Sequence, residues 1–99
     1  MSENRINENF GREVREERER SGISLHKLAS LLDMSPSYLS KLERGLVAPP
    51  SEKFIESMSE ILNIDRDYLM ASAGKVSRDI VGKIIEDPSI ARKIREEGY

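Results

Sequence analysis

The sequence predicts an all-α protein. Apolar residues recur three and four positions apart along most of the chain, which is the spacing of the buried face of a helix. No segment alternates strictly between apolar and polar residues, as a half-buried strand would. Serine, aspartate or glycine stands at the ends of several periodic segments, where helices begin and end. With 99 residues, the chain has room for one small domain and an appendage.

The first predicted helix covers about residues 7–20, and Gly22 ends it because glycine readily adopts the left-handed conformation that follows a helix. Residues spaced by four form its inward stripe: Ile6, Phe10, Val14 and Arg18. An arginine therefore continues an apolar face. An unpaired charge at such a position is costly, so Arg18 is expected to have an acidic partner.

Two short helices follow, separated by a brief turn. Ser24 is expected to cap a second helix that ends near residue 32, and the third helix starts at Ser35-Pro36 and ends near Arg44, before Gly45. A serine hydroxyl accepts a hydrogen bond from a free amide of the first turn, and a proline at the first helical position has no amide to satisfy. The inward residues of the two helices are Leu28, Ala29, Leu32, Leu39 and Leu42.

The remaining sequence divides into the end of a compact unit and a separate tail. Ser51 is expected to cap a fourth helix, Asp65 a short fifth helix with Tyr68 and Leu69, and Gly74 ends the unit. The apolar stripe of the fourth helix is Phe54, Ile55, Met58, Ile61 and Leu62. Residues 75–99 carry an apolar stripe of their own at helical spacing. Pro88 is expected to begin one or two further helical turns. We therefore expect a domain at residues 1–74 and a C-terminal helical tail at residues 75–99.

Residues 24–51 have the pattern of a helix-turn-helix motif, because two short helices flank a tight turn and the second opens with small hydroxylated residues. The stretch SLHKLASLLDMSPSYLSKLERGLVAPPS resembles the Cro/C1-type helix-turn-helix of phage repressors and related bacterial regulators. The likeness extends over roughly residues 8–74. It implies a five-helix, lambda-repressor-like fold and a double-stranded DNA operator as the partner. It also implies that the second helix of the motif enters the major groove.

The resemblance assigns DNA contacts to particular positions of this chain. The recognition helix is 36–44, and base readout is expected from Pro36, Ser37, Tyr38, Ser40 and Lys41. Lysine can donate to guanine, serine can donate or accept, and a tyrosine ring can cover a thymine methyl group. Phosphate contacts are expected from Ser24, His26, Arg44, Ser51 and Lys53.

Two positions depart from the family pattern. Leu25 stands where many members have a glutamine, and Pro36 replaces a frequent polar reader. Neither side chain can form the hydrogen bonds of the residue it replaces. The operator sequence is therefore not transferable from relatives.

In the family that the chain resembles, an arginine of the first helix bridges to a glutamate near the end of the recognition helix. Arg18 and Glu43 match these two positions. We interpret them as a structural ion pair and not as a contact to DNA.

The tail has two interpretations. It folds back on its own domain, or its apolar face is covered by self-association. Family members commonly bind palindromic sites as twofold dimers, and five branched aliphatic residues exceed what a small domain needs to cover. We therefore expect a homodimer through Val76, Ile80, Val81, Ile84 and Ile85. The alternative is a protein-interaction module, such as an antitoxin, whose tail binds a partner protein.

Composition restricts the other function classes. Sixteen basic and eighteen acidic residues give a net charge of −2, which argues against bulk attraction to nucleic acid. The only histidine is His26 and there is no cysteine, so we expect no metal or cofactor. No set of residues suggests an enzyme. No apolar stretch indicates a signal peptide or a membrane span, so a cytoplasmic transcriptional regulator is expected, most often a repressor that binds a palindromic operator.

Overall fold

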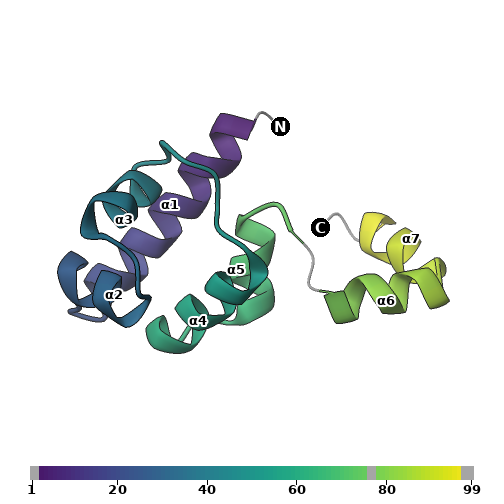
Figure 1. The fold of residues 1–99 in the computed structure, drawn as a ribbon. Helices are drawn as coiled ribbons and strands as arrows, with labels where there is room; N and C mark the ends of the chain where they lie inside the picture. Colours follow the sequence, from purple (N-terminus) through teal and green to yellow (C-terminus); the bar gives the residue numbers. More distant parts are fainter. Residues whose placement is uncertain (1–2, 76–77, 97–99) are drawn as a thin grey trace.

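The computed structural model describes residues 3–75 and 78–96. Regular structure in this part of the chain is entirely helical: α1 (Glu3–Arg20), α2 (Leu25–Leu31), α3 (Pro36–Glu43), α4 (Glu52–Leu62), α5 (Arg66–Ser72), α6 (Arg78–Glu86) and α7 (Ser89–Glu96). Figure 1 shows α1–α5 gathered into one unit, called the five-helix unit below, with α6 and α7 beside it. The predicted all-α fold is confirmed.

A single apolar core holds the five-helix unit together. Helix α1 contacts α3, α4 and α5, while α2 packs on α3 and α4 on α5. Burial of apolar side chains drives this packing. The buried apolar residues are Phe10, Val14, Leu28, Ala29, Leu32, Leu39, Leu42, Ile55, Met58, Leu62, Leu69, Met70 and Ala73. The inward apolar residues predicted for α2 and α3 are all among them.

Side-chain caps begin three of the helices where the sequence predicts. The Ser24 hydroxyl accepts from the Lys27 amide at 3.1 Å, and the Ser35 hydroxyl accepts from the Tyr38 amide at 3.0 Å. The carboxylate of Asp65 likewise caps α5. Ser51 occupies the capping position of α4, but its side chain makes no capping hydrogen bond. The boundary predicted at Ser51 is therefore confirmed, while the capping bond expected there is absent.

Two details of the helices differ from the prediction. Helix α1 begins at Glu3 and not near residue 7, because polar residues without an apolar stripe still extend a helix. The second difference is Phe54, whose side chain is 39% exposed instead of facing inward. The buried face of α4 centres on Ile55, Met58 and Leu62, and Phe54 lies about a quarter turn away from that centre.

Gly11 allows α1 and α3 to approach closely. A Cβ atom at Gly11 would lie 2.2 Å from the Leu42 carbonyl oxygen and 2.7 Å from that of Glu43. The same face of α1 passes close to Gly45, which has a φ of +74° and where a Cβ would lie 2.7 Å from the Cα of Glu8. Because Gly11 and Gly45 lack a Cβ atom, α3 and the turn that follows it can lie this close to α1.

The tail forms a hairpin in which α6 packs on α7. This packing splits the predicted apolar stripe, because Ile84 is half-buried while Val81 and Ile85 are 42% and 74% exposed. Val76 lies outside the described residues, as does the side chain of Ile80. Ile94 of α7 is also 39% exposed. An apolar surface on the hairpin thus stays open to solvent.

Among the described residues, no helix has the length and apolar character needed to cross a membrane.

Candidate nucleic-acid interface

Helix α3 presents a polar stripe to solvent. Ser37, Lys41 and Arg44 are exposed and follow one another at intervals of four and three residues, so they share one side of the helix. The opposite side is held in the core by Leu39 and Leu42, both fully buried. An exposed hydroxyl, an amine and a guanidinium are therefore carried on a firmly anchored helix.

The other residues predicted to read bases lie around this stripe. Tyr38 is 36% exposed, while Pro36 and Ser40 are half-buried. The Tyr38 amide is used by the Ser35 cap, and Tyr38 stands in the first turn of α3. The start of the helix thus combines an aromatic ring with small polar groups, a combination suited to the edges of bases.

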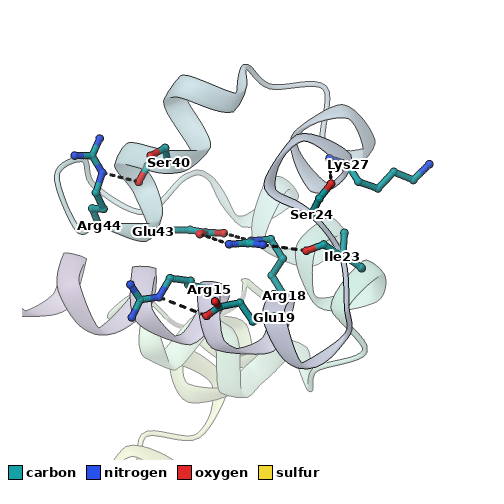
Figure 2. A network of polar contacts seen from close by, with 9 residues as sticks. All are labelled: Arg15, Arg18, Glu19, Ile23, Ser24, Lys27, Ser40, Glu43 and Arg44. Carbon is teal, nitrogen blue, oxygen red and sulfur yellow. Dashed lines mark hydrogen bonds and ion pairs between the residues drawn. The ribbon is translucent and has the colours of Figure 1, made fainter.

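The start of α2 offers a second group of exposed polar side chains. Ser24 and His26 are both exposed, as the prediction of phosphate contacts requires. The Ser24 oxygen already accepts from the Lys27 amide, which leaves its own proton available for donation. Figure 2 shows the Lys27 side chain extending away from the domain. Sequence reasoning did not single out Lys27, although a lysine three residues after a capping serine was a usable signal.

The start of α4 and the end of α3 carry the remaining predicted contacts. Ser51 and Lys53 are exposed at the first turn of α4. The Arg44 Nε donates to the Ser40 carbonyl oxygen at 3.3 Å, and its terminal nitrogens point away from the domain (Figure 2). Of the ten side chains predicted to contact DNA, Pro36 and Ser40 are half-buried, and the other eight are exposed.

Arg18 and Glu43 form a bidentate ion pair beneath the helix-turn-helix. The Nε and Nη2 groups of Arg18 donate to the two carboxylate oxygens of Glu43 at 2.7 and 3.0 Å. The two side chains are only 14% and 4% exposed. The hydrogen bond to Glu43 raises the pKa of Arg18 above its usual value, against the opposing effect of burial. Both groups are therefore turned inward and away from a ligand on the exposed face of α3.

A third bond extends this pair to the start of the motif. The Nη1 group of Arg18 donates to the Ile23 carbonyl oxygen at 2.9 Å (Figure 2). Ile23 immediately precedes Ser24, the cap of α2, and Glu43 is the last residue of α3. One guanidinium thus holds both ends of the helix-turn-helix against α1. Sequence reasoning did not identify the Ile23 carbonyl, because every residue has a carbonyl group.

Comparison with known proteins agrees with this geometry. Residues 9–70 match the model of a family described as a helix-turn-helix domain. The chain belongs to the Cro/C1-type helix-turn-helix family. The resemblance found in the sequence is thereby confirmed.

Curated relatives of this helix-turn-helix chain are named as HTH-type transcriptional regulators. It is 42% identical over 73 residues to the HTH-type transcriptional regulator SlrR of Bacillus subtilis, covering 74% of this chain and 48% of SlrR. The chain spans about half the length of the curated relatives it matches.

Two solved structures are similar to different shares of the chain. A crystal structure of SinR, the master regulator for biofilm formation, in complex with DNA is 35% identical. It has a TM-score of 0.56 and covers 61% of this chain and 95% of that one. A complex of SinR with the SinI protein is 27% identical with a TM-score of 0.57, and covers 88% of each chain.

Within residues 3–75 and 78–96, no three side chains of His, Cys, Asp or Glu lie together in a way that could hold a metal ion.

Proposed function

We propose that this helix-turn-helix protein is a transcriptional regulator that binds double-stranded DNA sequence-specifically and represses the genes next to its operator. The observation that carries the proposal is the exposed stripe of Ser37, Lys41 and Arg44 on a helix anchored by fully buried leucines. The likeness to SinR, whose structure is known in complex with DNA, supports the same activity. Repression needs only occupancy of the operator and no catalytic step. A cytoplasmic location follows from this role.

In the proposed complex, residues 36–44 enter the major groove with the start of α3 at the base edges. Base readout falls to Pro36, Ser37, Tyr38, Ser40 and Lys41, and phosphate contacts to Ser24, His26, Arg44, Ser51 and Lys53. Lys27 joins the phosphate group, because its side chain extends from the same exposed start of α2. The net charge of −2 makes non-specific attraction weak, so binding depends on these specific contacts.

Selection of bound fragments from a random pool of duplex DNA tests the proposal. We expect a palindromic consensus, and we expect Lys41→Ala to weaken binding to the selected site by about 10- to 100-fold, because a good base contact contributes about 1–3 kcal/mol. The melting temperature should not change, since Lys41 is exposed. Lys93→Ala on the exposed face of α7 is the matched control and should bind as the wild type does. A pool without enrichment would contradict DNA readout.

We also propose that residues 1–74 form the DNA-binding domain and that residues 75–99 contribute to a homodimer. The support is the open apolar surface of the α6–α7 hairpin, to which Val81, Ile85 and Ile94 contribute. Val76, Ile80 and Ile84 belong to the same proposed interface. A twofold dimer would place two recognition helices about one DNA turn apart, which matches a palindromic operator.

Ile85→Asp tests the dimer, because Ile85 is 74% exposed and its replacement leaves the fold of the protomer intact. We expect the sedimentation mass to shift from dimer to monomer and affinity for the selected DNA to fall with it. Lys83→Ala, an exposed position on the same helix, should change neither. If the Ile85→Asp protein keeps the mass of the wild type, this surface does not mediate the dimer.

A second candidate function is binding of a different protein through the tail. The complex of SinR with SinI favours it, because the matched region covers 88% of this chain. Purification of the tagged chain from its host separates the two candidates. Recovery of self-copies alone supports the homodimeric regulator, whereas a stoichiometric second protein that no longer co-purifies with Ile85→Asp supports the partner-binding module.

A further inference from the structure

Lys75 stands at a fixed point directly after α5. Gly74 has a φ of +70°, and the Lys75 amide donates to the Met70 carbonyl oxygen at 2.9 Å. A left-handed glycine with this backward hydrogen bond is a common helix ending, and it ties the next residue to the last turn. The backbone of Lys75 is therefore part of the five-helix unit.

The side chain of Lys75 connects this point to the start of α4. Its Nζ donates to the Pro50 carbonyl oxygen at 3.0 Å in a partly buried contact between residues 25 positions apart. Pro50 directly precedes Ser51, the capping residue of α4. Hydrogen bonds with a charged donor are stronger than neutral ones, so this contact can hold the end of a loop.

The loop between α3 and α4 makes few other backbone hydrogen bonds. Its beginning is fixed where the Leu46 amide donates to the Lys41 carbonyl oxygen at 2.9 Å. At its end stand Pro49 and Pro50, which have no amide hydrogen to donate. The Pro50 carbonyl is thus a natural place to fix the loop from outside, and Lys75 does so.

We propose that Lys75 is a positioning residue for DNA binding. By holding the Pro50 carbonyl, it sets the first turn of α4, with Ser51 and Lys53, at the height where that turn meets a DNA phosphate. Because its amine is engaged by the Pro50 carbonyl oxygen in a partly buried contact, it acts through α4 and not by touching DNA. This inference rests on the proposed DNA-binding function.

The test uses the full chain and its selected duplex DNA. We expect Lys75→Met to weaken binding roughly tenfold, because a charge-assisted hydrogen bond is removed. The slope of log affinity against log salt should become shallower by about 0.9 for each phosphate that the protein no longer neutralises, or about 1.8 per dimer. Lys75→Arg keeps a donor and should restore both the affinity and the slope.

A double-mutant cycle with Lys53→Gln separates positioning from direct contact. If Lys75 acts through the first turn of α4, the effects of Lys75→Met and Lys53→Gln are not additive. Additive effects would mean that Lys75 touches DNA by itself, and an unchanged salt slope would mean that it only stabilises the fold. Either result overturns the inference while DNA binding by the wild type stands. A wild type that binds no DNA would instead overturn the proposed function and this inference with it.

Discussion

Replacing Gly11 by alanine should destabilise the five-helix unit more than the addition of a methyl group at any exposed position. The added Cβ would lie 2.2 Å from the Leu42 carbonyl oxygen, well inside van der Waals contact, and that oxygen belongs to the backbone of α3. Helix α3 must move away from α1 to make room. We expect the free energy of unfolding to fall by about 3 kcal/mol, the upper part of the range for overpacked sites, as measured by chemical denaturation.

Gly82→Ala is the matched control for this experiment. Gly82 lies within α6, and a Cβ there would meet no atom within 4 Å. Alanine is the better helix former by about 0.5–1 kcal/mol, so this variant should be as stable as the wild type or slightly more so. If Gly11→Ala and Gly82→Ala unfold at the same denaturant concentration, α1 and α3 do not pack as closely as described.

The second large effect is expected at the buried ion pair. Glu43→Ala leaves the Arg18 guanidinium, whose side chain is 14% exposed, with the Ile23 carbonyl in place of a carboxylate. Removing one partner of a buried pair costs about 3–5 kcal/mol, because the other charge stays behind unpaired. In a domain of this size, a destabilisation of that order lowers the melting temperature by roughly 10 °C or more.

Lys41→Ala provides the comparison for Glu43→Ala. Both residues lie in the last turns of α3, but Lys41 is exposed, so its removal should change the free energy of unfolding by no more than about 0.5 kcal/mol. The two variants therefore distinguish a loss of folding stability from a loss of DNA base recognition. Lys41→Ala should lose DNA affinity at full stability, whereas Glu43→Ala should lose stability first. Equal melting temperatures would show that the pair does not stabilise the fold.

Much of the candidate interface could be predicted because its signals are local. Ser35-Pro36 and Gly45 mark the ends of α3, and the spacing of Leu39 and Leu42 identifies its buried side. The residues left over on the exposed side are then the candidate readers. The partner of Arg18 followed from the cost of a lone charge on an apolar stripe together with the family resemblance.

Other features could not be predicted, because they depend on how distant segments meet. Nothing near Gly11 in the sequence distinguishes it from a glycine in an exposed helix such as Gly82. The hydrogen bond from Lys75 to Pro50 joins residues 25 positions apart and ends on a backbone carbonyl. Phe54 matched an apolar stripe, but the direction from which neighbouring helices cover α4 leaves it partly exposed.

The sequence by itself determined most helix boundaries, three of the four expected side-chain caps and the side of α3 that faces outward, because these depend on spacing within a few residues. Only the tertiary structure decided how closely α1 and α3 approach, which carbonyl groups Arg18 and Lys75 hold, and which side of α6 stays open to solvent. Those outcomes depend on how the surfaces of distant segments fit together after folding. Several of the contacts end on backbone carbonyl groups, which every residue has and which a sequence pattern therefore cannot single out.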